Sequence, residues 1–115
     1  MSIVQFQVRM SDELVDRLGE AHLRDWGATS LSAFYRLIID RSKVDPSPPA
    51  IIGEGGPANV KVNFRFHPDQ WERLEHQRAA WDLPMSKTIK AMLSGYLHHG
   101  AADLLRHGIE MAGRE

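Results

Sequence analysis

The sequence VQFQVRM at residues 4–10 returns in altered form as VKVNFRF at residues 60–66. In both stretches apolar side chains alternate strictly with polar or basic ones, which is the period of a β-strand with one buried face. Such a strand turns its apolar residues toward a core and leaves the intervening residues at the surface. The apolar faces would be Val4, Phe6, Val8 and Met10 in one strand, and Val60, Val62, Phe64 and Phe66 in the other.

The opposite faces of the two strands hold basic and amide side chains and no acidic residue. Arg and Lys donate to the two acceptors of guanine in the major groove, and Gln and Asn pair with the donor and acceptor of adenine. A two-stranded β-ribbon also fits into that groove. The candidate base-contacting residues are therefore Gln5, Gln7, Arg9, Lys61, Asn63 and Arg65.

Two helices are predicted after the first strand. Ser11 is placed to cap the first of them, which should end near Gly27. Thr29 and Ser30 then offer a second cap before another helical pattern. This second helix should end before Pro46, because the residue that precedes a proline is disfavoured in helical geometry.

The same order of elements follows the second strand. Pro68 suits the first position of a helix, residues 83–85 form a turn, and Ser86 is placed to cap the last helix. A shift of 56 residues superposes the two strands, and a one-residue deletion in the turn then superposes the second helices. The chain therefore contains an internal duplication of strand, helix and helix.

The segment between the two copies is rich in proline and glycine. Four prolines and three glycines in residues 45–59 predict a linker without a long regular element, and Ile51 and Ile52 could pin its middle to the surface. We therefore divide the chain into a first repeat at 1–44, the linker at 45–59, a second repeat at 60–100 and a short amphipathic helical tail at 101–115.

Neither copy is large enough to bury a core of its own, and a lone strand leaves its backbone groups unpaired. Antiparallel pairing of residues 3–10 with residues 60–66 would remove both problems, with four helices packed on the shared apolar face. The expected fold is mainly α with a two-stranded antiparallel β-ribbon, in which the two copies form one pseudo-twofold unit.

Bulk composition limits the setting in which this chain works. It has 115 residues, a formal net charge of −1 and no cysteine, which fits a reducing cytoplasm. No apolar run approaches the length of a membrane span, and a strand pattern at the N-terminus leaves no room for a signal peptide. The acidic residues lie in the predicted helices, so a basic strand face can coexist with a near-neutral chain.

The arrangement resembles the ribbon-helix-helix (MetJ/Arc) superfamily. The resemblance is carried by residues 5–10 before a capped helix, by Gly27 with residues 30–36, and by residues 61–68 and 86–89. Two copies in one chain are similar to the TraY type of conjugation accessory protein. The resemblance implies that alternate strand residues contact bases and that the start of each second helix holds a phosphate, here around Thr29, Ser30, Ser86 and Lys87.

The chain departs from the family pattern at two positions. Ala33 stands where the second helix often has an acidic residue, and Leu83 stands where the turn often has glycine. These departures bear on the geometry of the turns more than on the fold.

The function implied by this resemblance is sequence-specific binding of double-stranded DNA without a cofactor. The protein would act as a plasmid transfer (relaxosome) accessory factor or as a transcriptional repressor, with the 101–115 tail available to a relaxase or another protein. The alternative is an antitoxin that binds a toxin and its own promoter. A monomer with an intrachain pseudo-dimer and a homodimer both fit the sequence.

Nothing in the sequence indicates an enzyme. No serine is accompanied by a histidine pattern typical of nucleophilic catalysis, and no glycine-rich loop follows a strand. His98 and His99 with His107 are more typical of a solvated helix end than of a metal site, because no carboxylate lies nearby at ligand spacing.

Overall fold

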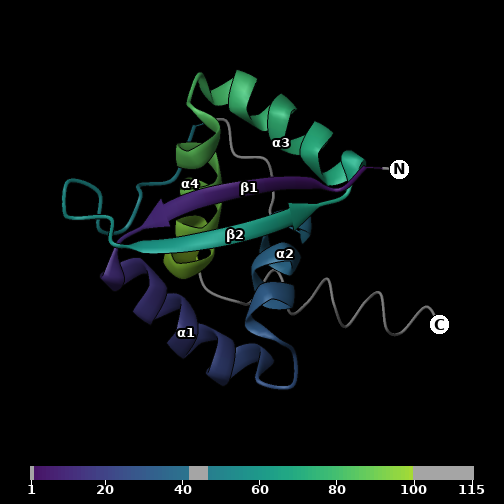
Figure 1. The fold of residues 1–115 in the computed structure, drawn as a ribbon. Helices are drawn as coiled ribbons and strands as arrows, with labels where there is room; N and C mark the ends of the chain where they lie inside the picture. The colour runs from purple at the N-terminus through teal and green to yellow at the C-terminus, as the bar shows by residue number, and fades with distance from the viewer. Residues whose placement is uncertain (1, 42–46, 100–115) are drawn as a thin grey trace.

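The fold is mainly helical, with a two-stranded ribbon laid across the helices (Figure 1). The computed structural model describes residues 2–41 and 47–99. In chain order the elements are β1 (Val4–Met10), α1 (Asp12–Trp26), α2 (Leu31–Arg41), β2 (Val60–Phe66), α3 (Pro68–Trp81) and α4 (Met85–His99).

The two strands pair with each other in antiparallel orientation, which confirms the predicted pairing of segments far apart in the sequence. At the centre of the ribbon Gln7 lies opposite Asn63. Residues 5 and 65 face each other toward one end, and residues 9 and 61 toward the other. Each strand shows the same alternation of exposed and less exposed residues along its length.

The apolar faces of both strands join a core to which all four helices contribute. Val8, Met10, Phe64 and Phe66 are buried, and the rings of Phe64 and Phe66 stack with their centroids 5.3 Å apart. The predicted apolar face is therefore confirmed at the buried end of each strand. The helices add Leu14 and Leu18 from α1, Phe34 and Ile38 from α2, Leu74 from α3, and Ile89 and Leu93 from α4.

Three helix starts agree with the sequence predictions, two of them through serine caps. Ser11 Oγ accepts a hydrogen bond from the backbone N–H of Leu14 at 3.1 Å, and Ser30 Oγ accepts one from Ala33 at the same distance. Pro68 occupies the first position of α3. These contacts satisfy backbone donors that the first turn of a helix leaves free.

The predicted cap of α4 is wrong. The helix begins at Met85, so Ser86 lies inside the first turn and does not precede it. The carbonyl of Pro84 accepts from both the backbone N–H and the hydroxyl of Thr88, each at 3.0 Å. Pro84 is thus the residue that closes the first turn.

The turn between α3 and α4 depends on a left-handed residue. Asp82 has φ 53° and ψ 48°, and its backbone N–H reaches the carbonyl of Ala79 at 3.3 Å. Asp tolerates this conformation better than most residues that carry a side chain. The turn therefore needs no glycine at Leu83, whereas Gly27 at the end of α1 is right-handed, with φ −59°.

The linker is pinned to the body through Ile52, as its apolar side chain predicted. Ile52 is buried, and its backbone N–H donates to Ser94 Oγ of α4 at 3.0 Å. Its carbonyl accepts from Ser11 Oγ at 3.4 Å, so the segment bridges the start of α1 and the middle of α4. Residues 49–54, here called the strap, hold this position.

Two close approaches fix the strap. A Cβ added to Gly95 of α4 would lie 3.0 Å from Pro49 Cγ, so the helix needs a residue without a side chain there. Gly53 has φ +78°, and a Cβ at that position would collide with Ser11 Oγ. The prediction that residues 45–59 lack a long regular element is confirmed for 47–59.

Two predictions fall on residues outside the described part of the chain. These are the end of the second helix before Pro46 and the helical tail at residues 101–115. Among the described residues, no helix combines the length and the apolar character needed to cross a membrane.

Candidate nucleic-acid interface

The six predicted base-contacting side chains are all exposed, and the register sets them in three facing pairs. Directly opposite residues of an antiparallel pair have Cβ atoms about 4.5–5.5 Å apart, so each pair acts as a neighbouring couple. Along the ribbon these couples are Gln5 with Arg65, Gln7 with Asn63, and Arg9 with Lys61.

The central couple is joined by a hydrogen bond. Gln7 Nε2 donates to Asn63 Oδ1 at 3.1 Å, and both side chains are exposed. The bond leaves the carbonyl oxygen of Gln7 as an acceptor and the amide of Asn63 as a donor. One acceptor and one donor side by side match the major-groove edge of adenine.

The three cations of the ribbon form no ion pair with any described residue. Within residues 2–41 and 47–99, no ion pair joins Arg9, Lys61 or Arg65 to a carboxylate. Arg9 and Lys61 face each other directly, an arrangement that is unfavourable between like charges until an anion or acceptor lies against it. The ribbon thus offers uncompensated donors on an otherwise near-neutral molecule.

The predicted phosphate-contacting residues before α2, Thr29 and Ser30, form hydrogen bonds within the turn and the helix start. Ser30 is exposed and caps the helix through its Oγ. Thr29 Oγ1 donates to the carbonyl of Trp26 at 2.8 Å, and the Thr29 carbonyl lies 2.6 Å from His22 Nε2. Thr29 therefore holds the turn between α1 and α2, while Ser30 lies beside the backbone N–H groups of the helix start.

The predicted phosphate contacts at the start of α4 differ from those of α2. Lys87 is exposed and its Nζ lies 3.4 Å from Glu54 Oε1, in a pair in which both side chains are about half exposed. Exposed pairs of this kind contribute little to stability. Ser86, in the first turn of the helix, is partly buried.

Two side chains with shifted pKa values, Asp25 and Tyr96, meet where α1 and α4 approach each other. The hydrogen bonds from Arg24 hold the pKa of Asp25 below its ordinary value, although burial acts in the opposite direction. Tyr96 Oη donates to Asp25 Oδ2 at 2.8 Å. Burial, followed by this bond to a carboxylate, raises the pKa of Tyr96 far above its ordinary value.

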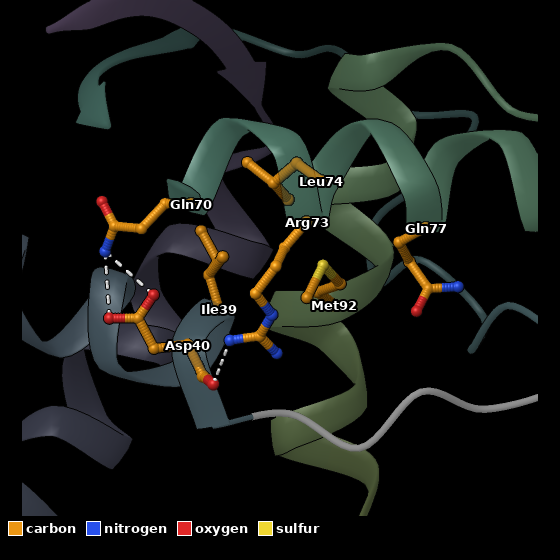
Figure 2. A pocket seen from close by; sticks show the side chains of 7 residues that line it. All are labelled: Ile39, Asp40, Gln70, Arg73, Leu74, Gln77 and Met92. Atoms are coloured by element: carbon orange, nitrogen blue, oxygen red, sulfur yellow. Dashed lines mark hydrogen bonds between the residues drawn. The ribbon is translucent and has the colours of Figure 1, made fainter. Parts of the chain in front are cut away.

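A small pocket opens where α2, α3 and α4 meet, and Figure 2 shows how its polar side chains lie. Gln70 Nε2 donates to both carboxylate oxygens of Asp40, at 2.9 and 3.0 Å. Arg73 Nη1 donates to the Asp40 carbonyl at 2.6 Å, near the C-terminal end of α2. These contacts satisfy the end of a helix and tie α2 to α3, which gives the pocket a structural role.

Sequence reasoning missed several polar residues that position these elements. Ser94 and Gly95 interrupt the apolar face of α4, and small residues inside such a stripe are a signal of a close backbone approach. The strap makes that approach, and His98 Nε2 adds a contact of 2.7 Å to the carbonyl of Ala50. Asp40 and Gln70 gave no such signal, because their partners are distant in sequence.

The part of the chain that the structure describes contains no group of three or more His, Cys, Asp or Glu side chains placed to hold a metal ion. Comparison of the chain with protein families, curated proteins and solved structures found no match. The case for a function therefore depends on the geometry of the ribbon.

Proposed function

We propose that this protein binds double-stranded DNA in a sequence-specific manner by placing the β1–β2 ribbon in the major groove. The observation that carries the proposal is the exposed face of the ribbon, which holds three cations and three amides and no carboxylate. The helices lie on the other face of the ribbon (Figure 1). The six polar side chains are exposed on the face that the helices leave uncovered. A two-stranded ribbon has the dimensions of a major-groove reader.

The register supports an intrachain pseudo-dimer of the ribbon-helix-helix type. The sequence repeat relates residue 7 to residue 63, and these same residues face each other at the centre of the ribbon. A twofold rotation about that central pair exchanges the Gln5–Arg65 couple with the Arg9–Lys61 couple. One chain would thus present the symmetric face that other proteins of this kind build from two chains.

Each end of the ribbon would meet one half of the DNA site. Arg9, Arg65 and Lys61 would donate to guanine acceptors, and the joined amides of Gln7 and Asn63 would read adenine. Backbone N–H groups at the start of α2 beside Ser30 would hold a phosphate and so fix the register of the protein on the duplex.

The start of α4 would contribute a second phosphate contact through Lys87. A phosphate arriving there would take the place of the Glu54 carboxylate, which now lies 3.4 Å from the Lys87 ammonium. Few cations take part and the chain is near-neutral, so non-specific binding should be weak and base contacts should dominate.

We place the protein among plasmid transfer accessory factors or transcriptional repressors, because both work by occupying a duplex site. The antitoxin alternative needs a tail or linker that wraps a toxin. The linker is instead bonded to the body through Ile52, and the tail at residues 101–115 lies outside the described residues.

The proposal is tested by selecting bound duplexes from a random pool and titrating the preferred site. We expect Arg9→Ala and Arg65→Ala each to weaken specific binding by about 5- to 150-fold, the value of one good base contact. Their circular dichroism spectra should match the unmodified protein, because both side chains are exposed.

Arg17→Ala, which removes an exposed arginine of α1, is the matched control and should leave affinity for the site nearly unchanged. Equal affinities for all four proteins, or failure of the selection to enrich any sequence, would refute the proposed function.

A further inference from the structure

We infer that the ribbon is directional: the protein sits on its DNA site in one orientation, with the Arg9–Lys61 end on the more guanine-rich half. The inference deepens the proposed function and depends on it. It follows from the difference between the two outer couples of the ribbon, in which Gln5 faces Arg65 and Lys61 faces Arg9. Gln5 and Lys61 are the residues that decide the orientation.

The central couple contributes little to a direction. Gln7 and Asn63 face each other at the centre of the ribbon and are joined by the 3.1 Å bond between their amides. Reversal of the protein on the duplex exchanges two amide side chains, and rotation of both amides then restores the same free acceptor and free donor at the same places. The preference for one orientation must therefore come mainly from the outer couples.

The outer couples contain one arginine each but differ in the second residue. Arg9 faces Lys61 at one end, and Arg65 faces Gln5 at the other. The first end carries two cations and no acceptor, and the second carries one cation and one amide. Lysine donates to guanine, whereas glutamine pairs with the donor and acceptor of adenine.

Reversal on the duplex would set Gln5 on the guanine chosen by Lys61 and Lys61 on the adenine chosen by Gln5. The second placement is the more costly, because a cation has no acceptor to offer the amino group of adenine. One wrong contact weakens binding by about 5- to 150-fold, so the preferred orientation should dominate by at least about 5-fold.

The absence of cysteine from the chain makes the orientation measurable. Ser2 and Asn59 are exposed and lie just before β1 and β2, so they mark opposite ends of the antiparallel ribbon. In the full chain, Ser2→Cys and Asn59→Cys would each carry an iron–EDTA group that cleaves nearby DNA. Bound to one end-labelled duplex of the selected site, the two proteins should cleave opposite flanks.

The deciding variant exchanges the two residues that set the direction. Gln5→Lys combined with Lys61→Gln leaves the composition and net charge unchanged and moves the doubly basic couple to the other end. Carrying the same probe at Ser2→Cys, this protein should cleave the opposite flank of the same duplex. The Arg9 and Arg65 positions stay untouched, so affinity for the site should change by less than about 5-fold.

The outcomes separate this inference from the function on which it depends. Specific binding with cleavage on both flanks, or with the same flank cleaved before and after the exchange, would overturn the directional reading and leave the proposed function in place. No enriched site at all would overturn both. Circular dichroism of the exchanged variant confirms that its fold is retained.

Discussion

Tyr96 shows how one side chain joins the two halves of the chain. Its hydroxyl donates to Asp25 at 2.8 Å, so that the last turn of α4 is tied to the last turn of α1. The carboxylate is nearly buried, with a side-chain exposure of 10%, and also accepts from the exposed Arg24. Hydrogen bonds to charged groups are among the stronger ones in proteins.

We expect Tyr96→Phe to lower the free energy of unfolding by about 1.5–3 kcal/mol, because the buried carboxylate loses a donor. Denaturant titration at neutral pH measures the loss. Asp25→Asn and the double variant complete a cycle that isolates the pair, and a coupling energy near zero would show that the bond does not contribute to stability.

The Tyr96–Asp25 pair predicts that the stability of the protein falls at both acidic and alkaline pH. The pKa of Tyr96 is raised in the folded state, so its contribution is complete below its ordinary value of 10.0 and is lost as the pH rises above it. The pKa of Asp25 is lowered, so its contribution is complete above its ordinary value of 3.8 and is lost as the pH falls below it. Thermal unfolding measured across the pH range should show both losses of stability. Tyr96→Phe should reduce the loss at alkaline pH. Part of that loss should remain, because burial also raises the pKa of Tyr35.

At the scale of elements, the strap explains how a proline-rich linker adds to stability instead of only connecting two copies. Ile52 enters the core, and both of its backbone polar groups are bonded to serine hydroxyls. Burial of an isoleucine side chain contributes about 1.5–3 kcal/mol. The strap therefore fastens the start of α1 to α4 across the linker.

We expect Ile52→Ala to destabilise the protein by about 2–5 kcal/mol, since it removes buried methyl groups and leaves a cavity. Ile3→Ala makes the same chemical change at a residue that is 46% exposed and should cost less than about 0.5 kcal/mol. Chemical denaturation of the two variants compares them directly. Similar losses in both would mean that the strap does not depend on Ile52.

At the scale of the whole molecule, the two strand-helix-helix halves of the chain share one core. Residues from β1 to α4 belong to a single apolar cluster, and the edge-to-face contact of Phe34 with Tyr96 at 5.4 Å joins the first half to the second. A shared core should unfold as one cooperative unit. Small domains whose parts cannot bury enough surface alone behave in this way.

We therefore expect Leu18→Ala, a change in the first copy, to destabilise the second copy equally. The loss should be about 2–5 kcal/mol. In a Trp26→Phe background, tryptophan fluorescence reports only the second half of the chain, through Trp71 and Trp81 in α3, whereas circular dichroism reports the helices of both halves. The two signals should give one midpoint, whereas Leu23→Ala, at a residue 75% exposed, should leave it in place. Separate transitions for the two probes would contradict a shared core.

The strands and the helix caps at Ser11 and Ser30 could be predicted from the sequence, because both depend on residues within a few positions of each other. The start of α4 was misread for a related reason. A serine is a good cap, but Pro84 follows two residues after Asp82, and the left-handed turn at Asp82 sets where the helix begins. The six polar strand residues were found as a set, and their grouping into couples was not.

The sequence by itself determined which residues form strands and helices, which strand face is apolar, and that the two strands pair with each other. Only the tertiary structure decided which residue faces which, how the strap enters the core, and where buried polar groups such as Asp25 find their partners. Local periodicity follows from the backbone geometry of one element, whereas register and packing depend on contacts between segments dozens of residues apart.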